Sequence, residues 1–244
     1  MGTLVIIGGI TALVGSVLAI RASDLKRILA FTTIMALGIL TMFLGGKTTP
    51  ALTAAMTFLM VHSLYKSSLF LVAGIIDHQT GTRQLDHIGG LLKSMPITAL
   101  AAATATLSMA GFPLFFGFIG KEIMYKGALT EDMFPVFATT AALLANSLMG
   151  AVAGLMIIKP FLGAVRSTPL LPREAPWSMW LGPVFLGSLG LFFGVVPDWI
   201  GRWLIEPAVR AGAELVLSVN STNRDAAVDW GVELVAIPDT PSSL

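Results

Sequence analysis

The chain contains no cysteine and very little charge. Of its 244 residues, 12% are Asp, Glu, Lys or Arg, whereas soluble domains carry about 25%. The lack of cysteine excludes a disulfide framework and any thiolate metal site. The formal net charge of +1, with no basic stripe, argues against a nucleic-acid partner. Apolar residues make up 55% of the chain and its mean hydropathy is +0.83, so the composition predicts an integral membrane protein.

Apolar runs that could cross a bilayer recur along the whole chain. A spanning helix needs about 20 such residues, and the sequence suggests seven candidate spans: 2–20, 25–45, 51–76, 96–110, 113–128, 134–162 and 177–200. The fourth and fifth are short because Gly111 and Pro113 interrupt a run too long for one helix. Short segments interrupted by Gly or Pro are typical of transporter binding regions. We therefore expect an all-α, multi-pass membrane protein with one discontinuous helix.

The connections between these spans carry most of the charge. We expect Asp77 to Ser94 to form a polar loop, and residues 206–219 to form an amphipathic surface helix before a polar tail. If seven spans alternate in direction, one side collects Arg21, Lys26, Arg27, Arg83, Lys93, Arg202 and Arg210, and the other collects Lys47, Lys159, Arg166 and Arg173. This difference is too small to assign an orientation by the positive-inside rule.

Three ionisable residues fall within or beside the uncharged runs. Lys66 follows His62 by four residues, so both lie on one helix face. Lys121 follows the uncharged run from Met95 to Gly120. Such groups cost roughly 2.5–3.5 kcal/mol at the centre of a span and therefore suggest a function, with ion or proton movement as the leading candidate. The alternatives are interhelical hydrogen bonds for His62 and Lys66, and a side chain reaching the headgroups for Lys121.

Other polar residues are weaker candidates. Lys26 and Arg27 begin a span, where cations that set topology are the plainer interpretation, and Asp24 can cap that helix. Glu122 points about 100° away from Lys121, so it either pairs with another helix or is solvated. The sequence lacks a phosphate loop, a nucleophile elbow and a zincin motif. We therefore expect no enzyme active site, no cofactor and no metal.

Three ordered motifs resemble the proton-antiporter-like membrane subunits. These motifs are Asp24-Leu-Lys26-Arg27-Ile-Leu-Ala-Phe-Thr-Thr, His62-Ser-Leu-Tyr-Lys66-Ser-Ser-Leu-Phe-Leu-Val-Ala-Gly74, and Gly111-Phe-Pro113-Leu-Phe-Phe-Gly117-Phe-Ile-Gly-Lys121-Glu122. That superfamily covers the antiporter-like subunits of respiratory complex I and the large subunits of Mrp-type sodium/proton antiporters. The loop Asp77-His78-Gln79-Thr80-Gly81-Thr82-Arg83 is similar to the corresponding loop of the large A-type subunit of Mrp antiporters. The resemblance thus favours the Mrp type, with a complex I-type redox proton pump as the alternative.

The resemblance implies a role for each matched residue. Lys121 corresponds to the lysine of a discontinuous helix that exchanges protons with one side of the membrane. His62 and Lys66 correspond to a polar pair along the proton path, and Lys26 to a lysine on the same axis. Asp24 and Glu122 are possible supporting residues. The implied partners are protons, Na⁺, lipid and other subunits of a complex in a bacterial plasma membrane.

The resemblance also implies a division of the chain. Residues 1–20 correspond to the last helix of a preceding repeat, 21–165 to the second of two inverted repeats, 166–205 to an additional spanning helix, and 206–244 to an amphipathic segment and polar tail. The glutamate–lysine pair of the first repeat has no counterpart in the sequence. We therefore expect a fragment or a split subunit that holds only half of a proton route.

Overall fold

The computed structural model describes residues 2–46, 48–131 and 134–211. Its α-helices are α1 (Gly2–Arg21), α2 (Leu25–Leu44), α3 (Thr49–Thr80), α4 (Pro96–Ala110), α5 (Phe116–Leu129), α6 (Pro135–Ile157), α7 (Trp177–Val195) and α8 (Pro197–Ile200). A short 3₁₀ turn (Leu85–His87) precedes α4, and π-helical turns follow α6 (Ile158–Leu162) and α8 (Gly201–Ile205). The described ranges contain no strand, which confirms the all-α prediction.

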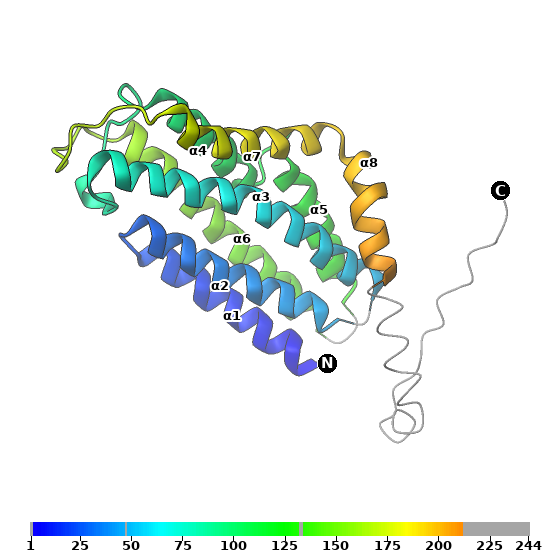
Figure 1. Cartoon of the computed structure of the whole chain (residues 1–244). Coiled ribbons are helices and arrows are strands. Elements are labelled where there is room, and N and C mark those ends of the chain that lie inside the picture. The colour runs from blue at the N-terminus through cyan, green and yellow to red at the C-terminus, as the bar shows by residue number, and fades with distance from the viewer. Residues whose placement is uncertain (1, 47, 132–133, 212–244) are drawn as a thin grey trace, which may run out of the picture.

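Five of the described helices are long and apolar enough to cross a membrane: α1, α2, α3, α6 with its π-helical turn, and α7. The multi-pass membrane prediction is therefore confirmed, although the structure does not confirm seven separate spans. At 15 and 14 residues, α4 and α5 are each too short. They follow one another along the bundle, so together they occupy the position of one crossing (Figure 1).

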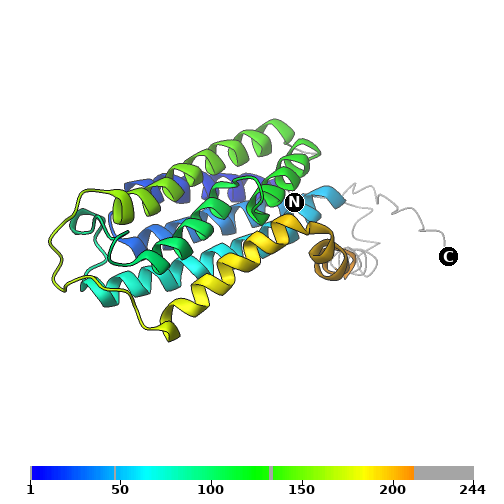
Figure 2. The same cartoon turned by 90° about the horizontal axis from the view of Figure 1, so that it is seen from above.

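The helices lie side by side in an elongated bundle (Figures 1 and 2). One end holds the connections 22–24, 81–95 and 163–176, and we call it the loop-rich end. The opposite end holds the start of α1, the end of α5, the start of α6 and α8, which turns away from α7. Since α3 and α6 both run toward the loop-rich end, the segment after α6 lies beside the segment after α3.

Local sequence signals fix where the helices begin and end. The Asp24 carboxylate accepts a hydrogen bond from the Arg27 N–H and caps α2. Thr48 caps α3 in the same way through the N–H of Ala51. Gly81 ends α3 in the left-handed conformation, with φ of 73°. Because this stop lies beyond Ile76, α3 continues through Thr80, and the prediction that the polar loop begins at Asp77 was wrong.

Small residues bring α1 and α2 into backbone contact. A Cβ added at Gly8 would lie 2.4 Å from the Met42 nitrogen, and one at Gly38 would lie 2.4 Å from the Ala12 nitrogen. Larger side chains here would force the helices apart, as in other membrane helix pairs that approach through glycine. The first span and the second therefore form a closely packed pair against which α6 also packs.

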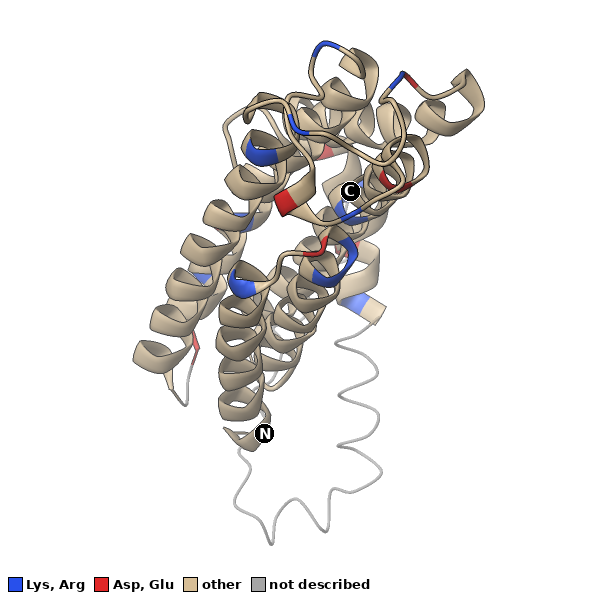
Figure 3. Ribbon diagram, turned by 90° about the vertical axis from the view of Figure 1, so that its left-hand side faces the viewer, with Lys and Arg blue, Asp and Glu red and all other residues tan. Residues whose placement is uncertain are grey.

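Charged residues gather at the loop-rich end (Figure 3). Lys159 pairs with Asp86 at 2.6 Å, and Arg166 donates to the Asp86 carbonyl, so the segment after α6 lies at the same end as the segment after α3. The Asp86 carboxylate accepts a hydrogen bond from Lys159 and lies near the charges of Lys159 and Arg166. Together these interactions hold the pKa of the Asp86 carboxyl below its usual value. The predicted partition of cations was wrong, because it counted the two short helices as separate crossings.

Candidate functional site

The discontinuous helix is interrupted between Ala110 and Phe116. α4 ends at Gly111, whose φ of 76° is in the left-handed region, and the chain stays non-helical until α5 begins. The Gly111 N–H bonds to the Ser108 carbonyl and the Phe112 N–H to the Leu107 carbonyl. Pro113 lies within this exposed turn. The predicted break is therefore present, and α4 has the bounds expected from the sequence.

Lys121 reaches back across this break. Its Nζ donates a 2.6 Å hydrogen bond to the carbonyl of Ala110, the last residue of α4. Its aliphatic chain runs past Gly111, where an added Cβ would lie 2.5 Å from Lys121 Cδ. Helix C-termini carry partial negative charge and unpaired carbonyls. The end of α4 is therefore a favourable place for an ammonium group that could not find water easily within an apolar bundle.

A small cavity lies beside Lys121. Its volume of about 10 Å³ is room for about one water molecule. Side chains and backbone from α2 through α6 surround it: Met35, Phe58, Val61, Tyr65, Ser108, Met109, Gly117, Lys121, Asn146 and Met149. Most of these residues are apolar. The polar residues that line the cavity beside Lys121 are Tyr65, Ser108 and Asn146, and they are candidates for contact with its ammonium group.

His62 and Lys66 lie in the core between α3 and its neighbours, with exposures of only 8% and 6%. The Lys66 ammonium donates to the Leu29 carbonyl and the Thr32 hydroxyl, both on α2. His62 Nδ1 lies 2.8 Å from the Tyr65 hydroxyl. Each predicted residue therefore has a polar contact, although within the described ranges no carboxylate pairs with Lys66 or Lys121.

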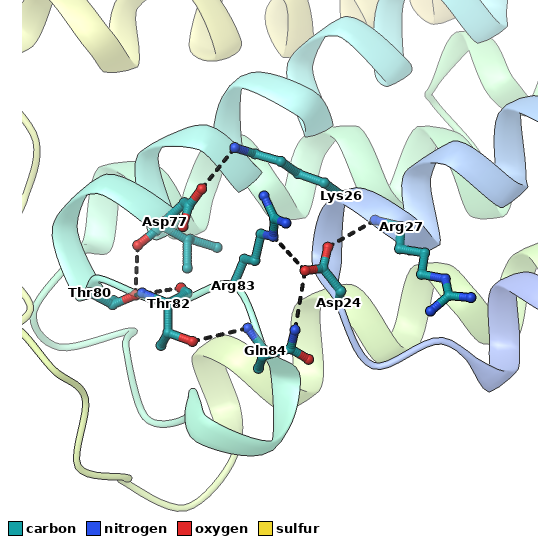
Figure 4. Close-up of polar contacts among 9 residues, drawn as sticks. Asp24, Lys26, Arg27, Asp77, Thr80, Thr82, Arg83 and Gln84 are labelled. Carbon is teal, nitrogen blue, oxygen red and sulfur yellow. Dashed lines mark hydrogen bonds and ion pairs between the residues drawn. The ribbon is translucent and has the colours of Figure 1, made fainter.

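Lys26 and Asp24 lie at the loop-rich end, in a polar cluster that joins the start of α2 to the end of α3 (Figure 4). Lys26 Nζ is 2.8 Å from Asp77 Oδ2. Asp24 Oδ2 is 2.5 Å from Arg83 Nε and also accepts from the Gln84 side chain at 3.3 Å. Lys26 precedes Leu29 by one helical turn, so it lies on the α2 face that Lys66 contacts. Lys26 is nearer to the loop-rich end than this contact is.

Glu122 and two further acidic residues, Asp77 and Asp86, are each paired with a lysine. Glu122 is exposed and pairs with Lys126 at 3.0 Å along α5, while Asp77 pairs with Lys26 and Asp86 with Lys159. In the part of the chain that the structure describes, no three His, Asp or Glu side chains gather as a metal site would require. Asp77, Asp86 and Glu122 therefore do not form a cluster of carboxylates that could hold a cation.

Several residues that complete the site were not predicted from the sequence. Tyr65 follows His62 by three residues, and this spacing alone places both on one face of α3. No sequence spacing links Thr32 or Asn146 to the site, because both residues lie on other helices. Thr32 on α2 contacts Lys66, and Asn146 on α6 lines the cavity. Contacts of this kind depend on how the helices pack.

The chain resembles known membrane proteins over most of its length. Residues 1–158 match the family described as NADH:quinone oxidoreductase/Mrp antiporter, TM. The A subunit of the Na(+)/H(+) antiporter of Alkalihalophilus pseudofirmus is 36% identical in an alignment 235 residues long that covers 86% of this chain and 29% of the relative. The A/B subunit of a probable K(+)/H(+) antiporter of Rhizobium meliloti is also 36% identical, over 92% of this chain and 23% of the relative.

Solved structures show the same fold. A chain of the Mrp complex from Dietzia sp. superposes with a TM-score of 0.76 at 23% identity, over 87% of this chain and 47% of that one. A chain of respiratory complex I from Thermus thermophilus superposes with a TM-score of 0.74 at 26% identity, over 88% of this chain and 44% of that one. The present chain thus spans less than a third of the curated relatives and about half of the structural ones.

Proposed function

This chain belongs to the NADH:quinone oxidoreductase/Mrp antiporter transmembrane family, and we therefore propose that it supplies part of the proton path of a multisubunit monovalent cation/proton antiporter. Lys121, His62 and Lys66 are the proton-carrying groups, and Lys26 extends the path toward the loop-rich end. Asp24 and Glu122 have supporting roles at most. The other subunits of the complex, Na⁺ and protons are the proposed partners.

The observation that carries this proposal is the setting of the two lysine ammonium groups. Lys66 is held by a carbonyl and a hydroxyl, and Lys121 by the carbonyl that ends α4. An ammonium that is buried against neutral acceptors loses the stabilisation that water or a carboxylate would give its charge. Such a group can release its proton to a neighbour at modest cost, which is what a proton path requires.

Protonation of these groups is coupled through charge. When one lysine or His62 carries a proton, like-charge repulsion disfavours a second proton on its neighbour. A proton arriving at Lys121 therefore favours release from His62 or Lys66, and the reverse. In the complete protein this alternation moves protons one at a time while the cation moves the other way.

The proposed cation is Na⁺, as in the name of the Alkalihalophilus relative. The loop Asp77–Arg83 also favours this type. The competing function is a proton-pumping subunit of a redox complex, because the Thermus complex I chain has the same fold at 26% identity. We also retain as proposals the division into residues 1–20, 21–165, 166–205 and 206–244, of which residues 212–244 lie outside the described ones.

The test is cation-driven proton flux in proteoliposomes that contain the complete complex. An imposed Na⁺ gradient should move protons without NADH or quinone, and Lys66→Ala should abolish this flux. Lys126→Ala is the matched control, because that lysine is on the surface with 70% of its side chain exposed. Flux that requires an electron donor would favour the redox function, and unchanged flux in Lys66→Ala would contradict the proposed path.

A further inference from the structure

Tyr65 joins two parts of the site that are otherwise separate. Its side chain lines the small cavity that Lys121 also lines, whereas neither His62 nor Lys66 reaches that cavity. Its hydroxyl lies 2.8 Å from His62 Nδ1. Phe58 also lines the cavity and packs against the His62 ring, but it is apolar. Among the described residues around the cavity, Tyr65 is therefore the polar side chain that contacts His62.

The hydroxyl is held in this position by the helix and the core. Tyr65 is 4% exposed and lies one turn from His62 on α3, with the two rings edge-to-face at 5.2 Å between centroids. A buried tyrosine hydroxyl needs a polar partner, and here His62 provides it. Tyr65 can therefore change its hydrogen-bond direction without any movement of the backbone.

We propose that Tyr65 is a proton-relay residue between Lys121 and His62, an inference that rests on the proposed function. A phenol hydroxyl both donates and accepts. The Lys121 ammonium gives a proton through a water of the cavity to the Tyr65 oxygen, while the original Tyr65 O–H bond breaks and its proton bonds to His62 Nδ1. Lys121 becomes neutral, His62 becomes cationic and Tyr65 ends unchanged; the reverse transfer uses the same bonds.

The relay also requires a definite tautomer of His62. Nδ1 must be the unprotonated nitrogen before the transfer, so that it can accept from the hydroxyl. The protonated imidazole then carries its charge on the same α3 face as Lys66, one turn away. Proton arrival at His62 is thereby felt electrostatically at Lys66, whose ammonium is already fixed to α2.

The chain offers a matched pair of variants for the test. Tyr65→Phe removes the hydroxyl and keeps the ring. Tyr125→Phe makes the same change at the other of the chain's two tyrosines. Tyr125 is half-buried on α5 and interacts with Asn146, but it does not line the cavity, and the contact with His62 that the relay requires belongs to Tyr65. In proteoliposomes with the complete complex, Tyr65→Phe should lower Na⁺-driven proton flux by at least about tenfold, while Tyr125→Phe keeps it.

The outcomes separate the relay from the proposed function. Wild-type flux in Tyr65→Phe, with no flux in Lys66→Ala, overturns the relay and leaves the proton path standing. An absence of Na⁺-driven flux in the wild-type complex overturns the proposed function itself. Complex yield measured for each variant shows whether a loss of flux is a loss of assembly.

A second substitution distinguishes a relay from a hydroxyl that only orients His62. Incorporation of 3,5-difluorotyrosine at position 65 keeps the hydrogen bond but makes the phenol a stronger acid and a weaker base. If the proton passes through the oxygen, the flux should change by roughly threefold or more, whereas the same replacement at position 125 should not change it. An unchanged flux at position 65 would overturn the relay.

Discussion

Lys66 and Lys121 differ in the groups that hold their ammonium groups, and that difference could not be read from the sequence. Lys66 contacts the Leu29 carbonyl and the Thr32 hydroxyl on another helix, and Lys121 contacts the carbonyl of Ala110 across the helix break. The sequence predicted that both are charged groups in apolar surroundings. It could not predict their acceptors, because backbone carbonyls carry no residue-type signal and Thr32 lies far away in the chain.

At the residue level, Thr32→Val should impair the site through Lys66. Valine has nearly the same shape as threonine but leaves the ammonium with one acceptor fewer, and a hydrogen bond to a charged group contributes about 1.5–3 kcal/mol. We expect Na⁺-driven proton flux to fall by about tenfold, measured in proteoliposomes. Thr41→Val on the same helix is the control, because the Thr41 hydroxyl bonds to the carbonyl of Leu37, which does not contact Lys66. Equal effects from both variants would contradict the role of Thr32.

At the level of elements, α4 is fixed at both of its ends by side chains from outside it. Its C-terminus binds Lys121. Its N-terminus has no capping side chain of its own; instead the Glu174 carboxylate accepts from the Ile97 N–H at 2.7 Å and from the Thr98 hydroxyl at 2.5 Å. A carboxylate at an N-terminus and an ammonium at a C-terminus both complement the helix dipole. The sequence predicted the bounds of α4 from Pro96 and Gly111, but the distant cap Glu174 gave no local signal.

Glu174→Ala should therefore destabilise the attachment of α4. Loss of an N-cap costs about 1–2 kcal/mol, and we expect a lower thermal unfolding midpoint in detergent. Arg173→Ala, the change next to it on an exposed side chain, is the control. A midpoint for Glu174→Ala equal to that of Arg173→Ala would show that the distant cap contributes no stability.

A second prediction for these elements concerns the helix break at Gly111. Gly111→Ala puts a Cβ at a φ of 76°, which costs about 1–2 kcal/mol, and places it 2.5 Å from Lys121 Cδ. Lys121 must then leave the Ala110 carbonyl, so proton flux should fall together with stability. Gly150→Ala is the control, because an added Cβ there meets nothing within 4 Å. Normal flux in Gly111→Ala would mean that Lys121 does not need this acceptor.

At the level of the whole molecule, cations collect at one end of the bundle. The loop-rich end carries Arg21, Lys26, Arg27, Arg83, Lys93, Lys159, Arg166 and Arg173. The sequence predicted a more even division, because Gly111 and Pro113 indicated two helices without revealing that the two share one crossing. The long spans were predictable, since about twenty apolar residues in a row are a strong signal. The end of the bundle at which each later connection lies depended on whether α4 and α5 count as one crossing or two.

Among the described residues, the opposite end carries only Lys126, Arg202 and Arg210, a wider margin than the sequence suggested. The charge distribution therefore predicts that the loop-rich end faces the cytoplasm. Since the chain has no cysteine, single cysteines can be labelled without background. In intact cells, a membrane-impermeant maleimide should leave Ser167→Cys unlabelled until the membrane is opened, and should label Asp198→Cys from outside. The reverse pattern would invert the bundle.

The most direct test of the proton path is made at Lys121. Lys121→Met keeps much of the length of the side chain and removes its ammonium, and Lys126→Met makes the same change on the exposed side of α5. Proton flux driven by a Na⁺ gradient should be lost in Lys121→Met and kept in Lys126→Met, with equal yields of assembled complex. Wild-type flux in Lys121→Met would contradict the proposal that protons pass through this lysine.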